Sequence, residues 1–280
     1  MTSVYEHIAA ARQTLIDSGL AREAATVDAE VLARHALGWD RARLVADGRE
    51  PAPPAFPARY APLVDRRSRR EPVAFITGHR EFWGLDFEVT TDVLIPRPES
   101  ELIIEAVCAR RRDDWPRRVL DVGTGSGCLA IALARELPDA RILATDISAA
   151  ALAVAARNAA RHGVADRVSF VRGDLLEPVS GIVDLVVSNP PYIAANVRLS
   201  PDITYFEPPV ALYSGVEGLD AVARVIATAG AVLDRDGMLA MEFGLGQDDR
   251  VEELARRAGW RDVSFDYDLQ GIARVALLKK

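Results

Sequence analysis

Seven short apolar segments in the later part of this chain constrain its fold more than any other feature of the sequence. They are rich in β-branched residues, and helical stretches separate most of them. Seven strands are predicted, at residues 119–122, 141–144, 168–172, 185–187, 238–243, 263–266 and 273–278. Apolar strands that alternate with helices are typical of a mostly parallel sheet covered on both faces. The last two segments leave no room for a helix, so we expect an antiparallel pair at the sheet edge.

The first 70 residues predict a small helical unit instead. Ser3 and Glu6 have the spacing of a capping box, and apolar residues follow at helical spacing. Val27 is expected to be buried on the second of four helices, which are predicted at about residues 4–18, 23–37, 41–46 and 60–70. β-Prone residues after Gly78 then predict a hairpin. We therefore expect a helical domain at residues 1–78, a hairpin linker at 79–95 and an α/β domain at 96–280.

Charge and hydropathy exclude several classes of protein. The 280 residues carry a formal net charge of −7, which argues against stable binding to a nucleic-acid backbone. No uncharged run reaches the ~18 residues of a membrane-spanning helix, and no apolar signal segment is found near the start. Cys108 and Cys128 lack metal-ligand spacing, so we expect no metal site and a cytoplasmic location. Two basic clusters, at 66–70 and 110–112, are either solvated helix faces or contacts for an RNA-rich surface.

A glycine loop follows the first predicted strand of the α/β domain. Gly123, Gly125 and Gly127 come directly after that strand and precede a helical stretch. Glycine lets the backbone approach a ligand closely, and a doubly wound sheet binds ligands at this edge. The dinucleotide fingerprint is not matched, because the third glycine comes one residue early and Cys128 holds its place. The loop also lacks the lysine of a phosphate-binding loop, so NAD and nucleoside triphosphates are disfavoured.

Three aspartates lie where such a sheet would present them to a ligand. Asp146 ends the second strand, about 20 residues past the glycines, where a carboxylate can accept hydrogen bonds from ribose hydroxyls. Asp174 ends the third strand and could accept from an exocyclic amine such as adenine N6. Asp121, within the first strand, could brace the loop or face a cation, and each aspartate could instead cap a helix. Together they imply an adenosine without phosphate that carries positive charge, which is the character of S-adenosyl-L-methionine.

The segment Ser188-Asn189-Pro190-Pro191-Tyr192 follows the fourth predicted strand, which should end beside the first. Proline fixes φ and removes an N–H donor, which leaves the carbonyls of the turn free to accept hydrogen bonds. The Asn189 side-chain oxygen and the Pro190 carbonyl make two acceptors for a planar NH₂ group, and Tyr192 offers a face for stacking. The segment therefore predicts a carboxamide, adenine N6 or cytosine N4 as methyl acceptor. A turn that only ends a strand is the alternative.

An amide nitrogen is a weak nucleophile because its lone pair is delocalised. Two acceptors that hold its hydrogens raise the electron density on nitrogen and fix its line of attack. The proton can leave after the methyl group has been transferred, so this chemistry requires no strong base.

Further motifs carry a resemblance to one family over nearly the whole chain. They are Pro72–Gly78, Glu81–Gly84, Val93–Glu101, Phe206–Pro208, Glu242–Gly244 and Asp268–Gly271. With the Asn-Pro-Pro-Tyr turn, they resemble the bacterial glutamine N5-methyltransferases that modify peptide-chain release factors. Ser100 stands where that family commonly has Thr, and Phe75 and Phe206 stand where it commonly has Tyr. None of these departures is expected to fall on the chemistry.

The resemblance implies an α/β fold, namely a Rossmann-like class I S-adenosylmethionine-dependent methyltransferase with a small N-terminal helical domain and a linking β-hairpin. The cofactor-binding residues that it implies are Gly123, Thr124, Gly125, Ser126, Gly127, Asp146, Ile147, Asp174, Leu175 and Asn189. The catalytic residues that it implies are Asn189, Pro190 and Tyr192. The substrate-binding residues that it implies are these three with Pro191, Arg97 and Glu99. The implied substrate is the glutamine of a Gly-Gly-Gln loop on a release factor.

Three alternatives remain open from the sequence. A DNA or RNA amino methyltransferase uses the same turn, but it would usually carry a basic target-reading module. A ribosomal-protein glutamine methyltransferase is a nearer relative, and only the N-terminal helical domain could distinguish it. A non-catalytic cofactor-binding module would bind the cofactor without turnover.

Overall fold

The computed structural model describes residues 2–110 and 116–280, which form two compact units. The smaller unit comprises the chain up to Gly78 together with the segment Leu199–Phe206. The larger unit comprises His79–Arg198 and Glu207–Lys280. No helix within the described residues is both long enough and apolar enough to cross a membrane.

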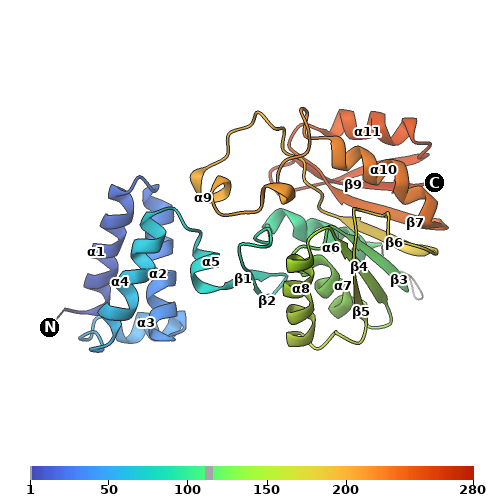
Figure 1. Cartoon of the computed structure of the whole chain (residues 1–280). Coiled ribbons are helices and arrows are strands. Elements are labelled where there is room, and N and C mark those ends of the chain that lie inside the picture. The colour runs from blue at the N-terminus through green and yellow to red at the C-terminus, as the bar shows by residue number, and fades with distance from the viewer. Residues whose placement is uncertain (1, 111–115) are drawn as a thin grey trace. The chain divides into compact units, whose positions relative to one another are not determined.

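The smaller unit is helical, as its sequence predicts. The described helices of this unit are α1 (Val4–Asp17), α2 (Arg22–Leu37), α3 (Arg41–Asp47), α4 (Phe56–Ser68), α5 (Val73–Thr77) and α9 (Pro201–Thr204) (Figure 1). The predicted capping box is confirmed, since the Glu6 amide donates to Ser3 Oγ at 3.2 Å and the Ser3 amide donates to Glu6 Oε2 at 2.6 Å. Both bonds satisfy N–H groups that a helix start leaves unpaired.

Two details of the helical unit differ from the predictions. Val27 is 61% exposed, because α2 turns Ala25, Ala29, Leu32 and Ala33 toward the core and Val27 outward. Helix α4 begins at Phe56, four residues before the predicted start at residue 60, because Pro57 falls in the first turn, where a helix needs no N–H. The ring of Phe56 thereby stacks on Tyr60, with centroids 4.9 Å apart.

The basic cluster at residues 66–70 is paired inside the smaller unit. Arg67 is buried and donates to Asp28 and to Asp202, at 2.7 Å in each case. The other arginines of the cluster also have partners: Arg66 with Glu71, Arg69 with Asp65, and Arg70 with Asp202 and the Gly19 carbonyl. Arg67 is therefore neither on a solvated helix face nor available to contact RNA, and both predictions made for the cluster are wrong for this residue. In the second cluster, Arg110 pairs with Asp266 at 3.0 Å, and residues 111 and 112 lie outside the described residues.

A seven-stranded sheet forms the centre of the larger unit. Its strands are β3 (Arg118–Val122), β4 (Arg141–Asp146), β5 (Val168–Arg172), β6 (Val183–Ser188), β7 (Leu233–Glu242), β8 (Asp262–Tyr267) and β9 (Ala273–Lys279). Their order is β5-β4-β3-β6-β7-β9-β8, and β9 is antiparallel to both of its neighbours. The mostly parallel sheet, the antiparallel pair at its edge and the position of β6 beside β3 are therefore confirmed.

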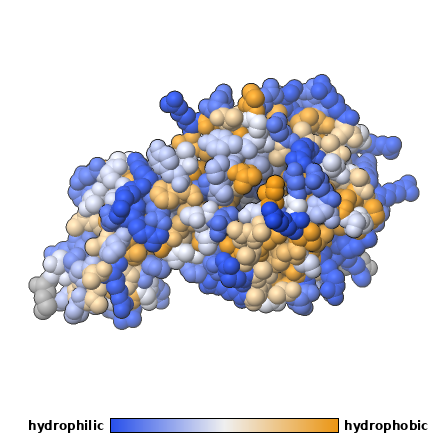
Figure 2. Space-filling model, viewed as in Figure 1, coloured by the Kyte–Doolittle hydropathy of each residue, from blue (hydrophilic) through white to orange (hydrophobic). Residues whose placement is uncertain are grey.

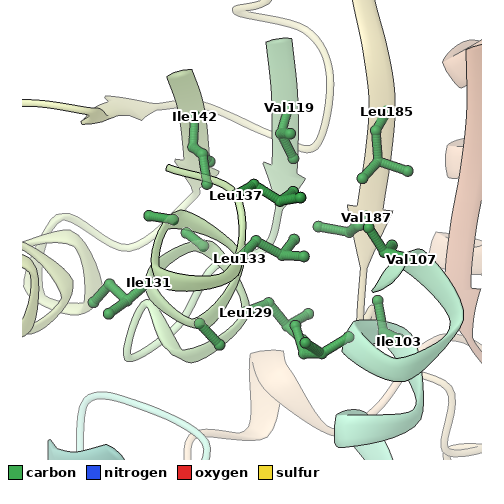
Figure 3. Close-up of a cluster of buried hydrophobic side chains, with 14 of the residues drawn as sticks. Ile103, Val107, Val119, Leu129, Ile131, Leu133, Leu137, Ile142, Leu185 and Val187 are labelled. Atoms are coloured by element: carbon green, nitrogen blue, oxygen red, sulfur yellow. The ribbon is translucent and has the colours of Figure 1, made fainter. Parts of the chain in front are cut away.

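Helices cover both faces of this sheet (Figure 1). One face carries α6 (Glu101–Ala109), α7 (Cys128–Glu136) and α8 (Ala149–Arg161), and the other carries α10 (Asp220–Val232) and α11 (Asp248–Arg257). Alternate strand residues serve the two cores, so Val119 of β3 packs under α7 while Leu120 faces α10. Figure 3 shows Leu129 and Leu133 of α7 packed among side chains from β3, β6 and α6.

The hairpin of β1 (His79–Phe82) and β2 (Leu85–Glu88) is part of the larger unit. Phe82 and Phe87 are buried in the core on the α7 side, where their rings contact edge to face. Two short 3₁₀ helices, η1 (Pro98–Ser100) and η2 (Pro209–Ala211), complete the described elements of this unit. Because β3, β4, β5 and β6 are parallel, the segments that follow them meet at one edge of the sheet.

Candidate active site

The loop after β3 is braced from beneath by Asp121. Its Oδ2 accepts a hydrogen bond from Thr124 Oγ1 at 2.6 Å and another from the Ala130 amide at 3.2 Å. Of the roles that the sequence allowed for Asp121, the structure shows bracing of the loop, together with a bond to an amide in the first turn of α7. The carboxyl is fully buried, and this burial raises its pKa to about 7. Asp121 therefore holds the start of α7 against the loop.

Three glycines of this loop are required for two different reasons. Gly123 and Gly125 have φ of +75° and +55°, and an added Cβ at either would enter open space. Both glycines line the pocket described below, so their backbone is open to a ligand. Gly127, with φ of +83°, is a packing residue instead, because its Cβ would meet Ile131 and Ala155 at 3.0 and 3.1 Å.

Asp146, at the end of β4, joins the loop to the next helix. Its Oδ2 accepts from the Gly125 amide and its Oδ1 from the Ser148 amide, at 2.9 Å in each case. Burial raises the pKa of this carboxyl. The neighbouring Ile147 is 47% exposed and lines the same pocket. Asp146 thus fixes the loop and also offers carboxylate lone pairs at the pocket wall.

Asp174 and Leu175, after β5, form another part of the wall. The Asp174 carboxylate accepts hydrogen bonds from both terminal nitrogens of Arg224, at 3.2 and 2.8 Å. Leu175 has a φ of +50°, a strained conformation for a branched residue, and its carbonyl accepts from Thr145 Oγ1 at 3.0 Å. Backbone strain of this kind is often found at binding sites.

These segments enclose a pocket of about 370 Å³ within the larger unit. Small-ligand pockets typically measure roughly 300–1,000 Å³. The predicted residues in its lining are Gly123, Gly125, Asp146, Ile147, Asp174, Leu175, Asn189 and Pro191. Thr124 and Ser126 are buried and Gly127 packs against α7 and α8, so none of these three is part of the lining. Figure 2 shows that both apolar and charged surface border the hollow on this face.

The Asn-Pro-Pro-Tyr turn meets the pocket through its first and third residues. Asn189 donates through Nδ2 to Ser100 Oγ at 2.8 Å. The hydroxyl of Tyr192 donates to Glu242 Oε1 at 2.8 Å, and its carbonyl accepts from Gln247 Nε2 at 3.1 Å. Pro190 is buried, and neither it nor Tyr192 is part of the lining. Tyr192 is thus anchored at both its hydroxyl and its backbone.

Arg97 and Glu99 lie outside the pocket lining. Arg97 pairs with Glu207 Oε1 at 2.5 Å, and the other oxygen of Glu207 accepts from the Ile95 amide at 3.0 Å. Glu207 is only 3% exposed, so a buried carboxylate holds the segment before η1 in place. Glu99 is exposed.

Three residues that organise the site were not predicted from the sequence: Ser100, Glu242 and Asn158. The sequence predicts that Ser100 lies away from the chemistry, but its hydroxyl contacts Asn189, the residue predicted to hold the acceptor amide. Glu242 is a carboxylate within the apolar run of β7, and such a residue must have buried partners. That anomaly was the available signal for Glu242, whereas Ser100 resembled an ordinary helix start.

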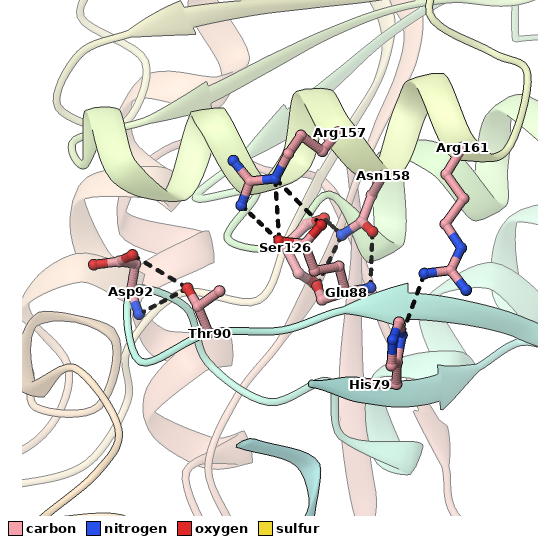
Figure 4. A network of polar contacts seen from close by, with 8 residues as sticks. All are labelled: His79, Glu88, Thr90, Asp92, Ser126, Arg157, Asn158 and Arg161. Atoms are coloured by element: carbon pink, nitrogen blue, oxygen red, sulfur yellow. Dashed lines mark hydrogen bonds and ion pairs between the residues drawn. The ribbon is translucent and has the colours of Figure 1, made fainter. Parts of the chain in front are cut away.

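Asn158 on α8 connects the glycine loop with the hairpin (Figure 4). Its Nδ2 donates to the carbonyls of Ser126 and Glu88, at 2.9 and 3.0 Å, and its Oδ1 accepts from the Glu88 amide at 2.8 Å. The residue is fully buried. A lone Asn inside an alanine-rich helix gave little sign of this role in the sequence.

The groups that line the pocket fit an adenosine cofactor without phosphate. Open backbone at two glycines, carboxylates at Asp146 and Asp174, and apolar side chains at Ile147 and Leu175 surround one space. Among residues 2–110 and 116–280, no group of three or more His, Cys, Asp or Glu side chains could hold a metal ion.

Comparison with known proteins relates this chain to two protein families and to a solved structure. A profile described as the Methyltransferase small domain matches residues 98–244, and one described as the PrmC N-terminal domain matches residues 6–78. The hMettl16 catalytic domain, solved in complex with MAT2A 3'UTR hairpin 6, has a TM-score of 0.58 at 20% identity and covers 77% of this chain and 82% of that chain. This likeness concerns the fold alone.

Similarity to curated proteins extends over nearly the whole chain. A release factor glutamine methyltransferase from Xylella fastidiosa (strain 9a5c) is 46% identical over 253 residues, which are 90% of this chain and 92% of that protein. One from Bordetella pertussis is 42% identical over 268 residues, 95% of this chain and 97% of that protein. Both halves of the chain are covered, including the glycine loop and the Asn-Pro-Pro-Tyr turn. The chain therefore belongs to the release factor glutamine methyltransferase family.

Proposed function

We propose that this protein transfers a methyl group from S-adenosyl-L-methionine to the side-chain amide nitrogen of the glutamine in the Gly-Gly-Gln motif of peptide-chain release factors. The observation that carries the proposal is that Asn189, on a rigid Pro-Pro turn, lines the same pocket as the glycine loop. Family membership supports the reaction, and the resemblance of the motifs supports the Gly-Gly-Gln target.

The cofactor would lie in the pocket of the larger unit. S-adenosyl-L-methionine supplies an electrophilic methyl group on a positively charged sulfur. Gly123 and Gly125 would allow close backbone approach, and Asp146 would accept hydrogen bonds from the ribose. Ile147 and Leu175 would cover the faces of the adenine ring, with Asp174 at its edge. Because Arg224 already holds Asp174 by two bonds, any contact to adenine N6 must use the remaining lone pairs of that carboxylate.

Asn189 and Pro190 would hold the acceptor amide. The Asn189 side chain uses its nitrogen to donate to Ser100, so its Oδ1 is on the other side of the amide and can accept from the substrate. The Pro190 carbonyl would be the second acceptor. Held in this way, the substrate nitrogen is oriented for attack, and such positioning can contribute several powers of ten in rate. The anchored Tyr192, with Pro191, would form a wall for the flat amide.

The rest of the chain would serve recognition of a protein partner. We assign residues 1–78 to a helical domain that orients the release factor, residues 79–95 to a hairpin linker and residues 96–280 to the methyltransferase domain. Arg97 and Glu99 would line the path of the Gly-Gly-Gln loop. A net charge of −7 supports a protein substrate, not a nucleic acid, and we propose that the enzyme acts in the cytoplasm.

Incubation of a candidate release factor with the protein and cofactor tests this function. Mass spectrometry of the digested product should locate one added methyl group on the glutamine of the Gly-Gly-Gln motif. A release factor whose motif glutamine is replaced by alanine is the control and should stay unmodified. Methyl transfer to RNA or to a ribosomal protein, with none to the release factor, would contradict the proposal.

A further inference from the structure

A continuous chain of hydrogen bonds, buried at its centre, leads away from the Asn-Pro-Pro-Tyr turn. Asn189 Nδ2 donates to Ser100 Oγ at 2.8 Å, and Ser100 Oγ donates to Glu242 Oε2 at 2.5 Å. The other oxygen of Glu242 accepts from the Tyr192 hydroxyl at 2.8 Å. Ser100 is 3% exposed and Glu242 is 1% exposed. One carboxylate therefore connects both polar side chains of the turn.

The direction of each hydrogen bond in this chain follows from the donors available. In its ionised form Glu242 can only accept, and both hydroxyls then donate their single proton to it. The Ser100 oxygen then has no proton left for Asn189 and can only accept from it. This requires the NH₂ of the Asn189 amide to face Ser100. The amide oxygen must consequently face the opposite way.

Orientation matters because the two ends of a primary amide have opposite hydrogen-bonding character. An Asn189 side chain rotated by half a turn would present its own NH₂ group to the substrate NH₂, and two donors cannot bond to each other. Burial and the nearby Glu99 raise the pKa of Glu242 above its ordinary value, although the two hydroxyl donors and Arg274 act in the opposite direction. Each carboxyl oxygen of this buried residue on β7 is paired with one hydroxyl, so neither oxygen is left without a partner.

We infer that Ser100 and Glu242 are positioning residues that set the orientation of the Asn189 amide, so that its oxygen accepts from the methyl-acceptor NH₂ group. The inference rests on the proposed function of Asn189 and adds the residues that make that function possible. Glu242 also fixes Tyr192, so the wall of the acceptor site and its hydrogen-bond acceptor share one support. Neither Ser100 nor Glu242 lines the pocket.

Two substitutions at Ser100 distinguish the effect of losing the hydroxyl from the effect of disturbing the packing. Ser100→Ala removes the connection between Asn189 and Glu242, and Ser100→Thr keeps a hydroxyl at the same place. We expect Ser100→Ala to lower kcat by about tenfold, the effect of one lost hydrogen bond in the transition state, with cofactor Kd unchanged within about twofold. Ser100→Thr should retain kcat near the wild-type value. Equal kcat in wild type and Ser100→Ala would overturn the inference.

A double-mutant cycle tests whether Ser100 acts through Asn189. In the Asn189→Ala background the amide is gone, so adding Ser100→Ala should slow the reaction no further. If Ser100→Ala slows that variant by the same factor as it slows the wild type, the two residues act independently and the inference is wrong. Glu242→Gln is a second probe, since glutamine can donate to Ser100 and remove the fixed direction. It should lower kcat by about tenfold or more while cofactor Kd is retained.

The outcomes distinguish this inference from the proposed function beneath it. If Asn189→Ala has wild-type kcat, the proposed role of Asn189 itself fails. If Asn189→Ala is slow while both Ser100→Ala and a folded Glu242→Gln are as fast as wild type, only the positioning network fails.

Discussion

At the scale of residues, the site depends on backbone conformations that few side chains tolerate. Gly123 and Gly125 take left-handed φ values where the loop faces the pocket, and Leu175, another lining residue, also takes one. The same conformation occurs at Gly38, which ends α2 in the smaller unit. The backbone of Gly123 and Gly125 faces the pocket, whereas that of Gly38 ends a helix, and this difference can be tested.

Alanine at Gly125 and at Gly38 should cost similar stability but differ in cofactor binding. Both glycines have positive φ, +55° and +66°, and open space around the added Cβ, so each variant should lose about 1–2 kcal/mol of unfolding free energy. Only Gly125→Ala should weaken cofactor binding, by about tenfold or more, because its Cβ would enter the pocket. Titration of the cofactor against each variant measures this. Equal Kd values for the two would show that the loop does not hold the cofactor.

The pKa of Asp121 predicts a dependence of stability on pH. Burial raises this pKa from 3.8 to about 7, so the folded protein binds a proton that the unfolded chain has released. The contribution of Asp121 to stability is therefore fully present below pH 4 and is lost as the pH rises through about 7. Unfolding free energies of the wild type and Asp121→Asn should diverge over that window, by at most about 1.4 kcal/mol per pH unit. Parallel curves for the two proteins would contradict this assignment.

Which site residues the sequence could predict follows from topology. Asp146 and Asn189 come directly after strands, and parallel strands bring their ends together, so their placement at the pocket was predictable. The contact between Ser100 and Glu242 joins residues 142 positions apart, and no local pattern encodes it. Which carboxylate oxygens are already occupied, as at Asp174, is likewise visible only in three dimensions.

At the scale of elements, periodic segments were predicted well and irregular ones were not. The strands β3 to β6 and their connecting helices follow from apolar runs and helical spacing. Strand β7 begins at Leu233, five residues before the predicted start at 238. The prediction started too late because residues 234–237 have the composition of a turn. The pairing of β6 with β7 shifts register there, so the structure retains this stretch as an irregular part of the strand.

Asn158 makes helix α8 a support for two other elements, and its loss should be costly. Asn158→Ala leaves the Ser126 carbonyl and both polar backbone groups of Glu88 without this partner, so we expect the unfolding free energy to fall by about 2–4 kcal/mol. The neighbouring Arg157, half exposed and paired with Glu88, is the matched control. Arg157→Ala should cost less than about 1 kcal/mol. Denaturant unfolding compares the two, and similar losses would mean that the buried amide is not a support.

At the scale of the whole molecule, the chain returns to its helical unit after the Asn-Pro-Pro-Tyr turn. The segment Leu199–Phe206 belongs to the smaller unit, although the residues on either side of it belong to the larger one. No prediction from the sequence included this return, because the segment has no strong periodicity and its partners lie more than a hundred residues away. The buried ion pairs of Arg67 with Asp28 and Asp202 hold it there.

Replacing Arg67 should therefore destabilise the helical unit. Arg67→Met keeps much of the side-chain volume but leaves Asp28 without a cation and Asp202 with only its 3.7 Å ion pair to Arg70, at an expected cost of about 3–5 kcal/mol. Arg69→Met removes an exposed ion pair from the same helix and should cost less than about 1 kcal/mol. Thermal unfolding of both variants provides the comparison. An Arg67→Met protein as stable as Arg69→Met would contradict the role given to this buried pair.

The central claim is that the Asn189 amide holds the acceptor nitrogen in line with the methyl group. Its most direct test is the single-turnover rate of methyl transfer to a release factor by Asn189→Ala, measured with the Kd of the cofactor for the same variant. We predict a rate at least about a hundredfold below wild type, on the order of 3 kcal/mol in barrier, with the cofactor Kd nearly unchanged. A rate near that of the wild type would contradict the claim.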